Sequence, residues 1–139
     1  MKTHNGNLDS LPPNGILVFG SNTQGRHGKG TALLAKTKYS AIQGKPIGLQ
    51  GKSYGIVTKD LTKKTHPSMP TKYILLQIKK LYEFAETHPN LDFYIPYLAD
   101  TQNLNNYTPS QMADMFSDPS VGPIPSNIVF EQGFSTLIR

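Results

Sequence analysis

The fold is decided by residues 15–31, GILVFGSNTQGRHGKGT. The run opens with four apolar residues, Ile16 to Phe19, whose branched and aromatic side chains are typical of a buried strand. A loop with glycines at positions 20, 25, 28 and 30 follows, and helix-forming residues begin after Thr31. This order of strand, glycine loop and helix is a common phosphate-binding arrangement in α/β proteins, because the loop backbone approaches closely and the helix N-terminus offers free N–H groups.

Neither standard phosphate motif fits this loop. A P-loop requires Lys directly after its second glycine, and Arg26 follows Gly25 instead. A dinucleotide fingerprint that starts at Gly28 fails because its third glycine position is Leu33. The pattern alone therefore leaves two interpretations open, a ligand-binding loop of a third kind and a tight turn without a ligand.

Length and composition narrow the class of protein. The 139 residues suffice for one domain, and the lack of cysteine excludes disulfides and thiolate metal sites. The net charge of +5 suits an anionic ligand, but it also agrees with simple solubility. No apolar run approaches the roughly 20 residues of a membrane helix, and residues 1–14 form a polar lead unlike a signal peptide. We therefore expect a cytoplasmic protein that does not contact membranes, in the host cytoplasm if a phage encodes it.

After the glycine loop, the chain alternates between predicted strands and helices. We expect strands at 53–58, 92–98 and 127–130, helices at 71–88 and 108–116, and loops at 40–51, 61–70, 99–107 and 118–126. Apolar residues three and four apart make helix 71–88 the best defined, with Thr71 as its N-cap. The alternation predicts a sheet with helices packed against it.

Several of these segments resemble a known family. Residues 19–22 and 25–30, followed by GLQGKSYGIVTKD at 48–60, are similar to small macro-domain-like proteins of bacteria and phages. Residues 84–89 and 125–129 match similar segments of that group, so the resemblance covers most of the chain from Gly15 onward. It implies an α/β fold over residues 1–139, a three-layer α/β/α sandwich with a mixed central sheet, which binds ADP-ribose or related molecules.

The resemblance assigns roles to residues near the glycine loop. Asn22 matches an asparagine that contacts the distal ribose, and Gly28 and Gly30 match a turn that lines the ligand. In phosphatase-like members, a His or Asp acts on the terminal phosphate of ADP-ribose 1″-phosphate. The predicted catalytic set is His27, Asp60 and Asn22. The predicted ligand-binding set is Gly20, Ser21, Asn22, Gly25, Arg26, Gly28, Lys29, Gly30, Thr31, Thr58, Lys59 and Asp100.

Asp100 belongs to a loop in which the chain departs from the family. Macro domains carry a second glycine loop there, which wraps the diphosphate, whereas residues 98–104 read LADTQNL. Side chains would then narrow the route that backbone amides normally line. Asp100 would also repel a diphosphate within a Debye length unless its carboxylate is solvated or paired.

The residues can be matched to hydrolysis of a phosphomonoester without the family. That reaction needs cationic or N–H groups on the phosphoryl oxygens, an in-line nucleophile and a protonated leaving oxygen. Arg26, Lys29 and the amides of residues 28–31 could supply the first, His27 could act as general acid or base, and Asp60 could orient water or the imidazole. We expect no cofactor and, with only four scattered histidines, no metal site.

Each of these residues also has an ordinary structural explanation. His27 could be a solvated loop residue, Asn22 could hold an Asx-turn, and Asp60 could cap the turn that follows it. Lys63 and Lys64 could simply form a solvated face.

Three functions therefore stay open. The sequence favours a phosphatase or hydrolase that acts on ADP-ribose derivatives, with a small nucleotide ligand as its partner. The alternatives are a non-catalytic ADP-ribose-binding module and, on the same fold, a protein that binds nucleic acid or another macromolecule through its basic face.

Overall fold

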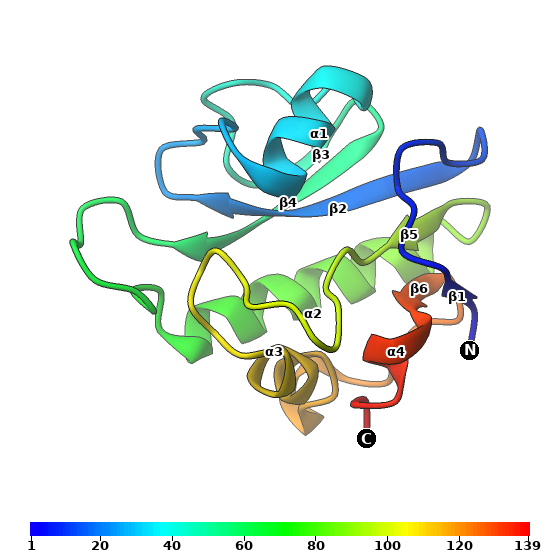
Figure 1. Ribbon diagram of the computed structural model, residues 1–139. Coiled ribbons are helices and arrows are strands. Elements are labelled where there is room, and N and C mark those ends of the chain that lie inside the picture. Colours follow the sequence, from blue (N-terminus) through cyan, green and yellow to red (C-terminus); the bar gives the residue numbers. More distant parts are fainter.

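The computed structural model describes residues 1–139 as one six-stranded sheet with helices on both faces (Figure 1). The strands are β1 (Thr3–His4), β2 (Gly15–Asn22), β3 (Gly48–Gln50), β4 (Ser53–Lys59), β5 (Asp92–Tyr94) and β6 (Ile128–Glu131). The helices are α1 (Gly30–Lys38), α2 (Thr71–Thr87), α3 (Pro109–Phe116) and α4 (Gln132–Ser135), with a 3-10 turn at Pro119–Val121. The predicted α/β class is confirmed.

The strand order in the sheet is β1-β6-β5-β2-β4-β3. All neighbouring strands are parallel except β3, which runs antiparallel to β4, so the sheet is mixed as predicted. β2 lies between β5 and β4 and pairs with both. The glycine loop therefore leaves the sheet from one of its central strands.

Alternate side chains of β2 enter two separate cores. Ile16 and Val18 belong to a cluster of 20 buried residues packed under α2, α3 and α4, which we call the α2 cluster. Leu17 and Phe19 belong to a cluster of 7 buried residues under α1, the α1 cluster. Figure 1 shows α1 on one side of the sheet and α2 with α3 on the other, which makes three layers.

The helices follow the predicted signals at most ends. Thr108 caps α3 with a full capping box, in which its side chain accepts a hydrogen bond from the Gln111 N–H, and Pro109 is the first helical residue. The prediction for α2 was wrong by one residue, since Pro70 is the N-cap and Thr71 already has helical geometry. No helix of the structure has the length and apolar composition of a membrane span.

Three further predictions are corrected by the structure. The strand expected at 92–98 ends at Tyr94, because Pro96 has no N–H with which to continue a ladder. Residues 48–50, expected as loop, form the antiparallel edge strand β3. Residues 3–4 of the polar lead pair with β6 as β1.

Candidate functional site

The candidate site lies where the chain leaves β2 and β5. From β2 the chain continues into α1 on one face of the sheet, whereas from neighbouring β5 it continues into α3 on the opposite face (Figure 1). Open α/β sheets bind ligands at the carboxyl ends of two such strands, because the connections diverge there. We call this place the β2/β5 switch point. Residues 23–29 form one side of it and residues 95–108 the other.

The shape of the glycine loop is fixed by Asn22. Its Oδ1 accepts hydrogen bonds from the Gln24 and Arg26 N–H groups at 3.2 and 3.0 Å, and its Nδ2 donates to the Arg26 carbonyl at 2.8 Å. The Asx-turn explanation of Asn22 is therefore the one that the geometry supports. The carboxamide holds the loop and keeps only its second Nδ2–H for a ligand.

Segment 41–50 supports the loop from behind. His27 is fully buried: its Nε2–H donates to the Ile42 carbonyl at 2.8 Å, and its ring packs edge-on against Phe19. Gly25, at φ +66°, touches the backbone of Gly44 so closely that an added Cβ would lie 2.5 Å from the Gly44 carbonyl carbon. The imidazole is therefore a packing and loop-holding group, and it does not face the switch point.

Buried Gln50 holds that supporting segment in turn. Its Oε1 accepts from the Ile42 N–H at 2.7 Å, and its Nε2 donates to the Lys45 carbonyl at 3.0 Å. Residues 41–45 would otherwise leave these backbone groups without partners. The glycine loop is thus positioned by four polar side chains, those of Asn22, His27, Gln43 and Gln50.

The first turn of α1 is open to a ligand. Its N-cap, Lys29, makes no side-chain cap hydrogen bond, and the backbone N–H groups of residues 28–32 donate to nothing in the structure. A Cβ added at Gly28 would meet no atom within 4 Å. Arg26 and Lys29 are exposed beside this turn. Free amides and two cations together form a site for an anion.

The loop after β5 approaches the same turn. A Cβ at Gly30 would lie 2.9 Å from Leu104 Cδ1, the flexible end of that side chain, and the φ of +56° favours glycine at this position. Leu104 itself is 60% exposed. A Cβ at Gly20 would lie 3.2 Å from the Tyr97 hydroxyl, whose pKa is raised by burial. The predicted narrowing of this route is therefore present, with Leu104 as the side chain that narrows it.

Asp60 directly follows β4, and the next residue, Leu61, donates its N–H to the Thr23 hydroxyl of the glycine loop. The Asp60 Oδ1 accepts from both the Thr62 hydroxyl, at 2.6 Å, and the Thr62 N–H, at 2.9 Å. These hydrogen bonds hold the pKa of the Asp60 carboxyl below its ordinary value. Asp60 is therefore an ionised turn cap at neutral pH and cannot donate a proton to a leaving group.

The rest of the predicted ligand-binding set divides in two. Arg26, Gly28, Lys29, Gly30 and the half-buried Thr31 surround the first turn of α1. The side chains of Ser21 and Thr58 are buried, Lys59 is half-buried at the end of β4, and Asp100 is exposed with its carboxylate accepting from the Thr101 hydroxyl. The predicted residues 28–31 thus lie together at the start of α1, and His27 and Asp60 hydrogen-bond to different segments of the chain.

The sequence analysis did not predict the roles of Gln50 and Leu104. It also missed Gln77, whose side chain binds the Val57 N–H and carbonyl on β4. Gln50 offered a signal, since it is polar, precedes Gly51 and lies in the stretch that carried the resemblance. Leu104 offered another, because it is the only apolar residue between Asp100 and Asn106. Compared with protein families, curated proteins and solved structures, the chain matches none of them.

Proposed function

We propose that the protein is a macro-domain-like module that binds ADP-ribose or a phosphorylated derivative of it, with the anionic groups at the first turn of α1. The observation that carries the proposal is the row of free backbone N–H groups at residues 28–32, beside exposed Arg26 and Lys29. Each charge-assisted hydrogen bond from such a group contributes about 1.5–3 kcal/mol.

The site's location gives independent support. The turn lies at the switch point of the sheet, where α/β proteins bind nucleotides, and the three-layer arrangement agrees with the resemblance. Leu104 adds exposed apolar surface near Gly30, which suits the uncharged face of a ribose or a base.

Binding is favoured over hydrolysis. The imidazole of His27 is buried and donates to a carbonyl, and the hydrogen bonds from Thr62 keep Asp60 ionised, so the imidazole is shielded from solvent and Asp60 cannot act as the general acid. We therefore propose the binding module, and we treat hydrolysis of ADP-ribose 1″-phosphate as an outcome that the experiment must test.

The test is isothermal titration with ADP-ribose, run beside a phosphate-release assay on ADP-ribose 1″-phosphate. Gly28→Glu adds a carboxylate in open space beside the free N–H groups of residues 28–32. We therefore expect the affinity of this variant for ADP-ribose to fall by at least about tenfold. The control Ser110→Glu, in the exposed first turn of α3, carries the same charge change and should bind like the wild type. Absence of heat from the folded wild type would refute the proposal, and phosphate release would restore the hydrolase interpretation.

A further inference from the structure

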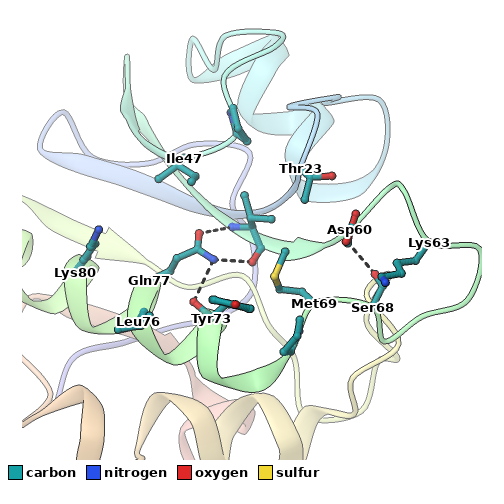
Figure 2. Close-up of a pocket in the computed structure, with 13 residues that line it drawn as sticks. Thr23, Ile47, Asp60, Lys63, Ser68, Met69, Tyr73, Leu76, Gln77 and Lys80 are labelled. Atoms are coloured by element: carbon teal, nitrogen blue, oxygen red, sulfur yellow. Dashed lines mark hydrogen bonds between the residues drawn. The ribbon is translucent and has the colours of Figure 1, made fainter.

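A second hollow of the surface lies next to the glycine loop, along the edge of β4 that β3 leaves free. It has a volume of about 760 Å3 and is bounded by β4, the loop after it, the first three turns of α2 and residues 46–47 (Figure 2). We call it the β4-edge groove. Its volume falls within the roughly 300–1,000 Å3 of typical binding sites.

The groove exists because β3 is short. β3 pairs with β4 only from Ser53 to Gly55, so the outer edge of β4 is uncovered beyond that point. The Gln77 side chain takes over there: its Oε1 accepts from the Val57 N–H at 2.7 Å, and its Nε2 donates to the Val57 carbonyl at 2.9 Å (Figure 2). The carboxamide thus takes the place of the backbone N–H and C=O that one residue of an antiparallel strand would offer.

Apolar side chains border this edge and stay in contact with water. Ile47, Tyr73 and Leu76 are 53%, 48% and 55% exposed, and all three line the groove. Scattered exposed apolar residues are ordinary, but several around one hollow indicate a surface that another molecule covers. Tyr in particular is enriched in the centres of protein interfaces.

The charges around the groove are almost all positive. Figure 2 shows Lys80 and Lys63 at opposite ends of the hollow, and Lys72 lies 5.2 Å from the centre of the Tyr73 ring. None of these lysines forms an ion pair. The one acid that lines the groove, Asp60, is hydrogen-bonded to Thr62. An occupant therefore needs negative charge at both ends and an apolar centre.

We infer that the β4-edge groove binds an extended acidic segment of a partner protein, with one bulky apolar side chain between acidic residues. The apolar side chain packs among Ile47, Tyr73 and Leu76, and the acidic residues meet Lys63 and Lys80. The segment adds to the sheet beyond β3, and the N–H and C=O of one of its residues replace the Gln77 carboxamide on Val57, as in a hydrogen-bonded antiparallel pair. Because each offers an N–H donor and a C=O acceptor, this exchange keeps both hydrogen bonds.

This groove is separate from the site of the proposed function. The switch point lies between β2 and β5, whereas the groove lies on the far edge of β4. Thr23, at the start of the glycine loop, lines the groove as well, but residues 28–32 do not, so failure of peptide binding and failure of ADP-ribose binding are distinguished by separate titrations.

The test uses a short fluorescein-labelled peptide of sequence Asp-Glu-Ile-Phe-Val-Glu-Asp and measures anisotropy on the whole chain. We expect binding that weakens at least about tenfold in Tyr73→Ser, about threefold in Lys80→Glu, and also with added salt. The matched controls are Leu33→Ser and Lys36→Glu, on the exposed face of α1, which should bind like the wild type. Amide NMR shifts should centre on Val57 and Tyr73.

A second variant tests the strand exchange. Gln77→Ala removes the group that competes for Val57, so the folded variant should bind the peptide at least as tightly as the wild type. Weaker binding would overturn the exchange. The proposal as a whole is overturned by no binding, by equal binding of a peptide with Lys in place of its acids, or by sedimentation showing that a second copy of the chain covers the groove.

Discussion

The two faces of the sheet are held by different kinds of interaction. The α2 cluster contains 20 buried residues, among them Phe116, Phe130 and Phe134, whose rings pack within 5.5 to 6.2 Å of one another. The α1 cluster contains only 7. On that side, the chain is fixed mainly by polar side chains that bind backbone groups, such as Gln50 on Ile42 and Asn22 on Arg26.

The comparison indicates that one face of the sheet supplies most of the folding free energy, whereas the other fixes the conformation of the glycine loop. Apolar packing is strong but non-directional, so the α2 cluster supplies stability without specifying a loop. Hydrogen bonds are weaker but directional, and they give the glycine loop one conformation that presents free amides. Substitutions on the two faces should therefore differ in how much stability they remove and in how many residues they disturb.

The largest effect is expected from Phe116→Ala in the α2 cluster. Phe116 is fully buried and contacts the aromatic rings of Phe130 in β6, Phe134 in α4 and Tyr97 in the loop after β5, so its removal leaves a cavity. We expect the free energy of unfolding to fall by about 3–5 kcal/mol, measured by urea denaturation. Fluorescence and circular dichroism should report the same midpoint, and a change confined to α3 would contradict a cooperative core.

A smaller and more local effect is expected from Gln50→Ala. The substitution leaves the Ile42 N–H and the Lys45 carbonyl without their partners, at a cost of about 1–3 kcal/mol. Hydrogen exchange should accelerate first at residues 41–45 and in the glycine loop. Equal acceleration throughout α2 would show that the two faces are not separable. The control Gln111→Ala, in α3, should leave those amides unchanged.

Asn22→Ala should act almost entirely on the site. It removes three hydrogen bonds within residues 22–26, near the solvent, so we expect a loss of stability of only about 1 kcal/mol. The amides of residues 28–32 should then be less well ordered, and the affinity for ADP-ribose should fall more than the stability does. Titration calorimetry and thermal unfolding together check this, and unchanged affinity would show that the loop shape is irrelevant to binding.

The sequence predicted the helices and strands that bury apolar side chains. It did not predict elements that depend on hydrogen-bonding partners elsewhere in the chain. Ile16 to Phe19 and the three- and four-residue spacing in α2 depend on local pattern, which is visible in a sequence. β3 is short, exposed and antiparallel, and its Gly-Leu-Gln run looks like loop. Pro96 correctly suggested a distortion, but only the structure shows that the strand ends before it.

The candidate site was predicted in part for the same reason. Glycines that need open space or positive φ, Gly28 and Gly30, can be recognised from their positions between strand and helix. The burial of His27 cannot, because its partner Ile42 is 15 positions away and offers a backbone carbonyl, which every residue possesses. Polar residues in a glycine loop therefore look catalytic or solvated in a sequence even when they are structural.

The smallest effect concerns Asp60 and leaves the overall fold intact. Its pKa lies below the ordinary value of 3.8 because the Thr62 side chain and N–H hydrogen-bond the carboxylate. A carboxyl with a lower pKa in the folded state adds stability above the unfolded pKa, and that stability is lost as the pH falls through the folded pKa.

Thr62→Val removes the hydrogen bond from the Thr62 hydroxyl, so the Asp60 pKa should rise toward 3.8 in an NMR titration of the carboxyl carbon. Asp118 is the control: hydrogen bonds from Ser120 lower its pKa in the same way, and Thr62→Val should leave that pKa unchanged. An unchanged Asp60 pKa would mean that the turn hydrogen bonds do not control this carboxylate. Asp60 would then again be a candidate for proton transfer near the glycine loop.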